Sequence, residues 1–350
     1  LAELKDLFAK ILGLEPDQII VGGNSSLNMM FDTIAQAMTH GMGGEPWGKQ
    51  GELKFLCPVP GYDRHFAITE YFGFKLIPVK MTAEGPDMDE VEELVKDSSV
   101  KGIWCVPKYS NPTGISYSDE VVCKFARLKP AAADFRIFWD NAYGIHHLYE
   151  DADRQDYLVE ILAECKKAGN PDMVYKFAST SKITFPGSGI AAIATSLNNL
   201  EDITKTMTHQ TIGHDKVNQL RHVRFFGDIH GMTEHMKKHA EIIRPKFEAV
   251  EEIFDTELSG LGIAKWTIPN GGYFISFDAL DGCAKKIVEK AKKAGVLMTD
   301  AGATWPYHND PKDSNIRVAP TYPPLEDLKT AATLFALCVK LVSAKKILEE

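Results

Sequence analysis

The sequence predicts an α/β protein with a mostly parallel sheet, followed by a smaller α+β domain. Between residues 24 and 232, short apolar runs alternate with helical patterns, which is the order of elements in a parallel sheet covered by helices. Beyond residue 258 this alternation gives way to a mixture of strands and helices. A chain of 350 residues, 44% of them hydrophobic, is long enough for two domains, which we place at 1–232 and 233–350.

The elements of the first domain follow in order. The chain opens with an amphipathic helix whose apolar positions include Leu4, Phe8 and Ile11. A Gly/Ser segment at 22–26 then precedes a second helix with an apolar face. Six short apolar runs have the composition of buried parallel strands. They are Lys54–Pro58, Lys75–Val79, Gly102–Pro107, Arg136–Trp139, Val174–Ala178 and Ile190–Thr195.

A charged helical pattern from Met232 to Leu258 links the two domains, with the linking helix at about 233–258. Pro245 lies midway along it. Because proline removes a backbone hydrogen bond and clashes with the preceding turn, we expect a kink or a break there. The second domain is then predicted as a strand at 271–277, a helix at 283–294, a strand at 316–319 and a closing helix at 325–342.

Composition narrows the class of protein. The net charge is −9 and no basic stripe is present, which argues against a nucleic-acid partner. No apolar run is long enough to span a bilayer, so we expect a soluble protein without a membrane partner. The six cysteines are scattered without the spacing of metal ligands, and no secretory leader is recognised. These features are typical of a cytoplasmic enzyme with reduced thiols and no metal.

Polar side chains follow three of the predicted strands. Asn111, Asp140 and Lys182 each come shortly after an apolar run, and Tyr143 follows Asp140 closely. Because ligands in parallel sheets bind beyond the carboxyl ends of the strands, these side chains are expected to meet in one site. A single lysine after a strand is usually a solvated surface residue. An amine, a carboxylate, an amide and a phenol together suit a charged pyridine cofactor.

The chemistry of pyridoxal 5'-phosphate accounts for each of these groups. Its aldehyde needs an amine to form a Schiff base, which Lys182 can supply. A carboxylate beside the pyridine nitrogen favours its protonated form, and Asp140 suits that role. The ring oxygen needs neutral hydrogen-bond donors, which Asn111 and Tyr143 provide.

The phosphate of such a cofactor would find two candidate segments. Ser179 and Ser181 directly precede the lysine. Ser25 and Ser26 lie where the Gly/Ser segment opens a helix, and a helix N-terminus presents free N–H groups and a positive dipole end to an anion. The alternative for these two serines is simple capping of the helix.

The motifs together resemble a fold type I pyridoxal-phosphate-dependent aminotransferase, most closely the aspartate-aminotransferase-like branch often called MocR-like. They occur in the order of the family and span nearly the whole chain: Gly22–Leu27, Pro60–His65, Asn111–Gly114, Asp140–Tyr143, Ser179–Lys182 and Asn315–Val318. The resemblance implies a three-layer fold with a mostly parallel seven-stranded sheet and a smaller C-terminal domain. It also implies that Lys182 is the Schiff-base lysine of a transaminase.

Three further roles come from the resemblance. Tyr62 matches the aromatic residue that stacks on the pyridine ring, although a core tyrosine is the alternative. His65 matches a histidine behind the ring-nitrogen aspartate, where a neutral imidazole would keep Asp140 ionised. The alternative is an exposed or capping histidine. Arg317 matches the arginine that binds the substrate α-carboxylate through its planar fork, the alternative being a surface ion pair. Asn111 is expected to contact the substrate as well.

The sequence departs from the family at the phosphate site. Members usually carry an arginine eight residues after the lysine, where this chain has Ile190. Ser188 and backbone N–H groups, or a cation such as Lys216 of a partner chain, could replace it. Arg64 and the segment around Lys216 are candidates for binding a substrate side-chain carboxylate, although a solvated or interface surface is the alternative for that segment. The family's N-terminal arm and its phosphate-binding tyrosine are not recognised in the sequence.

The resemblance implies an aminotransferase that moves an amino group between an amino acid and a 2-keto acid, with aspartate and 2-oxoglutarate as the expected pair. It also implies a homodimer whose active sites draw on both chains. Two alternatives stay open. One is another pyridoxal-phosphate reaction, by a lyase or decarboxylase, on the same scaffold. The other is a non-catalytic effector domain of a MocR-type regulator.

Overall fold

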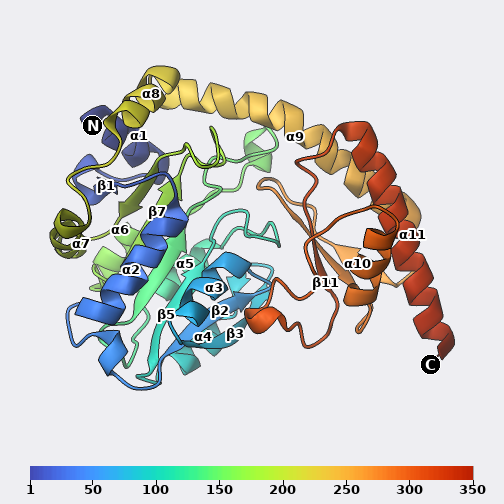
Figure 1. Ribbon diagram of the computed structural model, residues 1–350, viewed down its shortest axis with the longest axis horizontal. Helices are drawn as coiled ribbons and strands as arrows, with labels where there is room; N and C mark the ends of the chain where they lie inside the picture. Colours follow the sequence, from blue (N-terminus) through green and yellow to red (C-terminus); the bar gives the residue numbers. More distant parts are fainter. Residues whose placement is uncertain (350) are drawn as a thin grey trace.

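The computed structural model describes residues 1–349 as a large and a small part joined by one long helix (Figure 1). The large part is built on a single sheet of eight strands in the order β1-β8-β7-β6-β5-β2-β3-β4. The strands are β1 (Ile19–Val21), β2 (Lys54–Val59), β3 (Lys75–Thr82), β4 (Gly85–Pro86), β5 (Val100–Cys105), β6 (Arg136–Asp140), β7 (Val174–Ser179) and β8 (Ala191–Ala194).

The centre of this sheet is parallel and its edges are antiparallel. The five strands β3, β2, β5, β6 and β7 pair in parallel, whereas β8 and β1 on one side and β4 on the other pair antiparallel. All six predicted strands are present, and the mostly parallel α/β fold is confirmed. The expected seven strands become eight because the three-residue β1 and the two-residue β4 pair at the edges, and both are too short to show a pattern in the sequence.

Two layers of helices cover the sheet because its strands are apolar on both faces. Trp139 of β6 and Ile103 of β5 face a core shared with α1, α4, α5 and α6, whereas their neighbours Phe138 and Trp104 face a core shared with α2 and α3. The helices are α1 (Ala2–Leu12), α2 (Ser26–His40), α3 (Asp63–Tyr71), α4 (Met88–Leu94), α5 (Asp119–Ala126), α6 (Ile161–Ala168), α7 (Leu197–Gln210) and α8 (Lys216–Phe226). Short 3-10 turns are η1 (Pro16–Gln18), η2 (Trp47–Lys49) and η3 (Ala152–Arg154).

The linking helix α9 (Ile229–Leu258) is continuous over 30 residues with Pro245 inside it, so the break considered from the sequence does not occur. Its first turns contribute Met232 and Met236 to the core of the large part, and Phe247 and Phe254 pack into the core of the small part. Pro245 cannot donate the backbone hydrogen bond of a regular helix, but the packing of both ends of α9 into the two cores keeps the helix continuous there.

The small part packs α9, α10 (Ala284–Lys293) and α11 (Leu325–Glu349) around a three-stranded antiparallel sheet. Its strands, in the order β11-β10-β9, are β9 (Ala264–Trp266), β10 (Ile275–Ala279) and β11 (Asn315–Val318). The order β10, α10, β11 and α11 agrees with the predicted strand, helix, strand and closing helix, whereas the strand β9 was not predicted. The 3-10 turn η4 (Pro306–His308) touches the large part, where the Leu76 amide donates to the Tyr307 hydroxyl at 2.8 Å.

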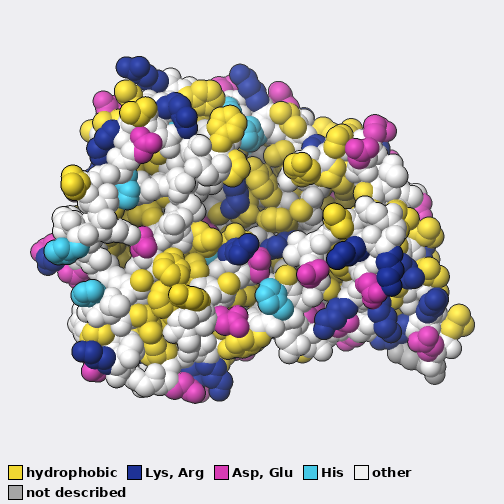
Figure 2. Space-filling model, viewed as in Figure 1, with side chains coloured by type: hydrophobic (Ala, Val, Ile, Leu, Met, Phe, Trp, Pro, Cys, Tyr) yellow, Lys and Arg dark blue, Asp and Glu magenta, His cyan; other side chains and the backbone are white. Residues whose placement is uncertain are grey.

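The face of the molecule seen in Figure 2 is hollowed between the two parts. Hydrophobic side chains form much of the floor of this hollow, and Lys or Arg side chains stand beside it (Figure 2). Across the described residues 1–349, none of the helices is both long enough and apolar enough to cross a membrane.

Candidate active site

Three adjacent parallel strands place the predicted side chains at one edge of the sheet. β6 pairs in parallel with β5 on one side and β7 on the other. Asn111 lies in the loop after β5, Asp140 is the last residue of β6, and Lys182 lies in the turn after β7. Lys182 and Asp140 both act electrostatically on Tyr62, which precedes α3. The structure therefore brings the predicted amine, carboxylate and aromatic ring together.

Both the side chain and the backbone carbonyl of Lys182 are in contact with neighbouring residues. Its Nζ lies 4.5 Å from the centre of the Tyr143 ring, a cation–π distance. Its carbonyl accepts a hydrogen bond from the Tyr273 hydroxyl at 2.7 Å and lies 3.4 Å from His146 Nε2. Burial, and then the charge of Lys182, lowers the pKa of His146 to about 3. The imidazole is therefore neutral and donates to the carbonyl from Nε2.

Asp140 has one oxygen engaged and one free. The side chain is buried, and its Oδ2 lies 3.0 Å from His65 Nε2. His65 is buried and stacks on Trp104, with ring centres 4.6 Å apart. The other oxygen, Oδ1, is buried without a hydrogen-bond partner among the described residues. A buried carboxylate oxygen without a donor is costly, so this atom marks a position for a ligand N–H.

Two phenols complete the wall of the site. Tyr143 is buried, and burial raises the pKa of its hydroxyl above the usual range. Burial also raises the pKa of Tyr62, whose ring lies edge-on to His65 with centres 4.9 Å apart. Both hydroxyls are therefore neutral at physiological pH and can donate hydrogen bonds.

Arg317 reaches the same site from the small part. Its Nη1 donates to Asn111 Oδ1 at 3.3 Å and to Asp63 Oδ1 at 2.8 Å. The predicted arginine and the predicted asparagine are thus in contact, although they are 206 residues apart in sequence. The surface ion pair considered as the alternative does not describe this residue, because only 10% of the Arg317 side chain is exposed.

The two serine-containing segments lie against each other. Ser181 Oγ donates to the Asn24 carbonyl at 3.1 Å, and the Asn24 side chain donates to the Gly187 carbonyl at 2.8 Å. Ser25 caps α2 by accepting from the Leu27 amide, so the capping role considered for it is present. A side chain on Gly189 would begin 2.9 Å from the Ser181 amide, so glycine keeps this approach close.

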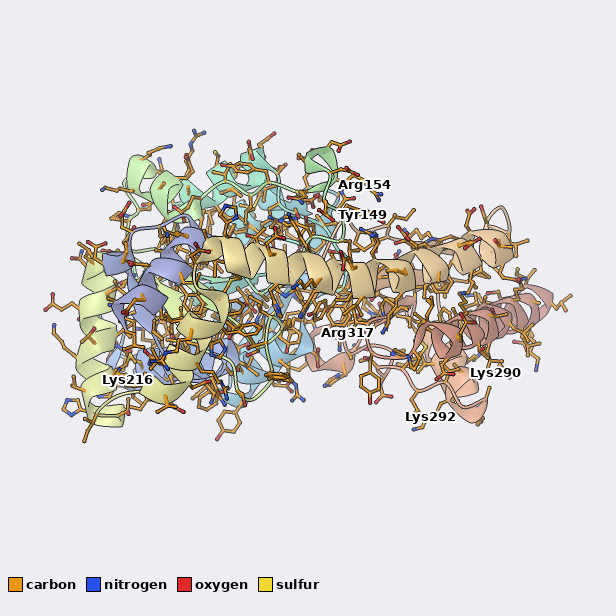
Figure 3. All side chains as sticks on the ribbon, turned by 90° about the horizontal axis from the view of Figure 1, so that it is seen from above. Tyr149, Arg154, Lys216, Lys290, Lys292 and Arg317 are labelled. Carbon is orange, nitrogen blue, oxygen red and sulfur yellow. The ribbon has the colours of Figure 1, made fainter. Side chains whose placement is uncertain are left out.

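Three predicted residues lie at the surface of this chain. Arg64, Ser188 and Lys216 are exposed. Figure 3 shows Lys216 at the start of α8, well away from Arg317 along the length of the molecule. A cation that does reach the 186–189 loop is Arg221, whose Nη2 lies 3.4 Å from the Ser188 carbonyl oxygen. Arg221 and Asn24 line one cavity of about 470 Å³ beside these loops.

Sequence reasoning did not assign a role to four residues of this site. From the sequence, Trp104 is expected only as a core residue and Tyr273 only as part of a strand, and no role is predicted for His146 or Asp63. The glycine pair before Tyr273 was a usable signal of close backbone approach, and the structure bears this out, because a side chain on Gly271 would begin 2.4 Å from the Tyr109 ring. Asp63 lies within the Pro60–His65 motif, but nothing in its local pattern points to Arg317, which is 254 residues away.

Known proteins with similar sequences include aminotransferases. The sequence model of the family described as "Aspartate amino-transferase" matches residues 1–350. The aspartate aminotransferase of Corynebacterium glutamicum is 45% identical over 347 residues, which cover 99% of this chain and 80% of that protein. A protein of Mycolicibacterium smegmatis is 47% identical over 351 residues, covering 99% of this chain and 81% of its own length.

Solved structures agree with these sequence matches. The crystal structure of an aspartate transaminase from Corynebacterium glutamicum superposes with a TM-score of 0.96 at 44% identity, covering 98% of this chain and 81% of that chain. The α-aminoadipate aminotransferase of Thermus thermophilus, complexed with N-(5'-phosphopyridoxyl)-L-leucine, gives a TM-score of 0.80 at 18% identity. It covers 98% of this chain and 82% of that chain, and shows that the same fold persists at low identity.

Proposed function

Because this chain belongs to the aspartate aminotransferase family and is a pyridoxal-phosphate-dependent aminotransferase, we propose that its amino donor is aspartate and its acceptor 2-oxoglutarate. The similarity to the aspartate aminotransferase of Corynebacterium glutamicum supports a dicarboxylic donor. The observation that carries the site assignment is the buried Asp140 carboxylate, with one oxygen against His65 and the other without a donor.

The residues present fit the cofactor. The free Asp140 Oδ1 would accept from the pyridine N–H, and the hydrogen bond between His65 and Oδ2 would fix the orientation of the carboxylate. Tyr62 would lie against the ring, and Asn111 and Tyr143 would face the ring oxygen. When bound, pyridoxal phosphate supplies an electron sink and a carrier for the amino group.

Lys182 would act as the general base and acid. Its Nζ would take the proton from the substrate Cα and deliver it to the cofactor in the same half-reaction, and it would carry a proton in the reverse direction when the acceptor reacts. The hydrogen bond from Tyr273 to the Lys182 carbonyl fixes the backbone, so that only the side chain has to move. The Tyr143 ring, which the Lys182 amine contacts, restricts the positions that the lysine side chain can adopt.

Arg317 and Asn111 would bind the substrate α-carboxylate. The guanidinium presents N–H groups in a plane, which suits two carboxylate oxygens better than a lysine would. The Asn111 side chain gives its oxygen to Arg317, which leaves its amide N–H groups for the substrate. Arg64 and Lys216 remain the candidates for the side-chain carboxylate of the donor.

The phosphate would lie at the N-terminus of α2. Free N–H groups at Ser25 and Ser26, together with the hydroxyls of Ser179 and Ser181, would bind it. Ser188 is a further candidate on the neighbouring loop. No arginine occupies position 190, where Ile190 is buried, so a cation from the partner chain, with Lys216 the first candidate, is proposed to balance the charge.

The active form is proposed to be a homodimer with composite sites. Exposed large apolar side chains on and before α8 support a partner surface, because burying them against a second chain would remove them from water. They include Ile212, Val217 and Phe225, of which Ile212 is fully exposed. The proposed donor Lys216 lies in the same segment.

A screen of amino donors tests the reaction and the substrate together. The holoenzyme is mixed with one amino acid at a time, without an acceptor, and the cofactor absorbance and the keto acid are measured. A single equivalent of oxaloacetate per site from aspartate, with the amino group retained on the cofactor, is expected. Release of ammonia or carbon dioxide would instead identify a lyase or a decarboxylase, and a lack of reaction with any donor would contradict an enzyme.

A further inference from the structure

Among the described residues, Arg317 makes side-chain hydrogen bonds through only one of its nitrogens. Nη1 donates to Asp63 Oδ1 at 2.8 Å and to Asn111 Oδ1 at 3.3 Å, which accounts for both of its hydrogens. Nε is buried without a partner, and no hydrogen bond from Nη2 is found among the described residues. The unused Nε–H and Nη2–H lie along one edge of the planar guanidinium, as a parallel pair of donors.

That arrangement fixes which edge of the guanidinium is open. The two acceptors on Nη1 come from different elements, Asp63 from the first turn of α3 and Asn111 from the loop after β5. The Phe274 ring lies beside the guanidinium, with its centre 5.2 Å from Cζ. Rotation of the fork would break the ion pair with Asp63, so the open edge is held in one direction.

The ion pair is also well shielded. The exposed fraction is 10% for the Arg317 side chain and 22% for that of Asp63. An arginine buried to this extent without a counter-charge would be costly before the substrate arrives. Asp63 therefore stabilises Arg317 in the substrate-free protein, while leaving the pair of donors that a carboxylate needs.

We propose that Asp63 is a positioning residue, which orients Arg317 so that its Nε–Nη2 edge receives the α-carboxylate of the substrate. This inference rests on the proposed role of Arg317 in substrate binding. Asp63 acts through Arg317 and stays paired with it when the substrate binds. Because the donor and the acceptor both carry an α-carboxylate, its effect is the same for both substrates.

The test compares Asp63→Ala and Asp63→Asn in the holoenzyme. With alanine, Arg317 loses its fixed direction, so KM for both aspartate and 2-oxoglutarate should rise about tenfold, while kcat changes less than about twofold. Asparagine keeps the Oδ1 acceptor without the charge, so Asp63→Asn should restore part of the loss. A monocarboxylic donor should show the same ratio between variant and wild type as aspartate does.

Equilibrium binding of succinate, which carries no amino group, gives a second readout without turnover. Its Kd should rise in parallel with KM in Asp63→Ala. An unchanged or lower KM and Kd would overturn the inference, because a lower value would mean that Asp63 competes with the substrate for Arg317. Equal losses in kcat for the alanine and asparagine variants would also overturn it.

Two control variants separate this inference from the proposed function. Glu257→Gln removes a carboxylate from a partly buried ion pair with Lys340, in the small part, and should leave both KM values unchanged. Arg317→Gln should raise both KM values far more than Asp63→Ala does. If Arg317→Gln leaves them unchanged, the proposed role of Arg317 fails; if it raises them and Asp63→Ala does not, only the role of Asp63 fails.

Discussion

Asp140 illustrates how one buried carboxylate can be prepared for a ligand. Its Oδ2 lies against His65, which is itself fixed by stacking on Trp104, so the carboxylate cannot turn to hide Oδ1. The free oxygen is buried and has no partner among the described residues. Such an arrangement costs stability in the absence of a ligand and therefore favours binding of a cationic N–H.

Asp140→Ala should reduce transamination on the order of 100-fold or more, while cofactor binding weakens less, because the pyridine nitrogen would lose the group that keeps it protonated. Single-turnover rates and cofactor titration would measure the two effects. Asp134→Asn is the matched control, since Asp134 is a buried carboxylate that pairs with Lys101 away from the site. Turnover of Asp140→Ala near the wild-type rate would refute the role.

Lys182→Ala should still bind the cofactor through its ring and phosphate contacts but should lose the covalent attachment. Borohydride reduction of the wild-type holoenzyme, followed by peptide mapping, should place the modification on Lys182 alone. Lys176→Met serves as the control, because Lys176 is a buried lysine on β7 paired with Glu160. A reduced adduct on any other lysine would remove Lys182 from the mechanism.

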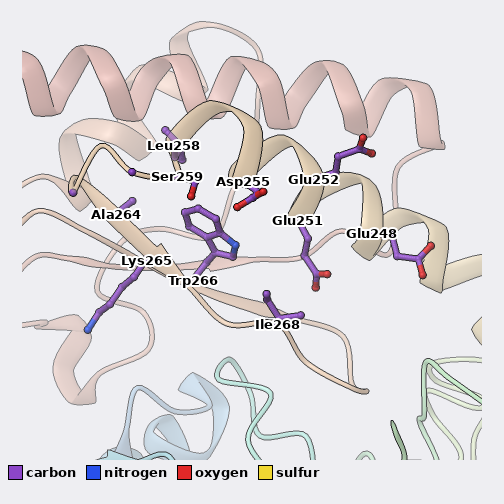
Figure 4. Close-up of a pocket in the computed structure, with 12 residues that line it drawn as sticks. Glu248, Glu251, Glu252, Asp255, Leu258, Ser259, Ala264, Lys265, Trp266 and Ile268 are labelled. Atoms are coloured by element: carbon purple, nitrogen blue, oxygen red, sulfur yellow. The ribbon is translucent and has the colours of Figure 1, made fainter. Parts of the chain in front are cut away.

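Among the elements, α9 carries a carboxylate with an unusual titration. Figure 4 shows Glu251 beside Ile268 and Trp266 in a pocket between α9 and β9. Burial, and then the nearby charge of Glu248, raises the pKa of Glu251 from 4.5 to about 7. The folded state therefore holds a proton here that the unfolded chain releases between about pH 4.5 and 7.

The stability of the folded protein should therefore depend on pH through Glu251. The contribution of Glu251 to stability is complete below its unfolded pKa of 4.5 and is lost as the pH rises through about 7. Glu251→Gln, which stays neutral, should raise Tm at pH 8 by about 1–2 °C and change it less at pH 5, after allowing for solvent screening. Glu241→Gln, an exposed site on α9, should show no difference between the two pH values. A larger gain at pH 5 than at pH 8 would contradict the assignment.

At the scale of the whole molecule, both parts of the chain contribute to one site, and a partner chain is proposed to contribute as well. Lys182 and Asp140 come from the large part and Arg317 from the small part. Gly61 donates to the Thr304 carbonyl at 2.8 Å, which ties the two parts together close to Asp63. Lys216 is exposed and remote from Arg317 within one chain (Figure 3), so it cannot bind the same substrate molecule as the Arg317 of its own chain.

Subunit complementation tests that role. Lys182→Ala and Lys216→Ala proteins are mixed under conditions of proven subunit exchange. If Lys216 acts in trans, one site of the mixed dimer carries both lesions and the other carries neither, so activity should partly return. The expected recovery is about a quarter of the wild-type activity at equal mixing, since half the dimers are mixed and each has one intact site. A monomer in sedimentation, or no recovery despite exchange, would exclude the idea.

The sequence by itself determined the class of fold, the cofactor and the reaction. Short apolar runs in the sequence indicate buried parallel strands, and Asn111, Asp140 and Lys182 come shortly after such runs. Because parallel strands end at the same edge of a sheet, this local pattern was enough to predict that the three side chains lie there. The fold that these features predicted and the aminotransferase activity that the family resemblance implied are confirmed, whereas the residue roles remain predictions.

The tertiary structure decided what depends on distant partners. The edge strands β1 and β4 exist only because neighbours supply their hydrogen bonds, and α9 passes through Pro245 because both of its ends pack into cores. The contact of Asp63 with Arg317 joins residues 254 positions apart. No periodicity or spacing in the sequence indicates such a pair, because the two residues meet only when the two parts pack together.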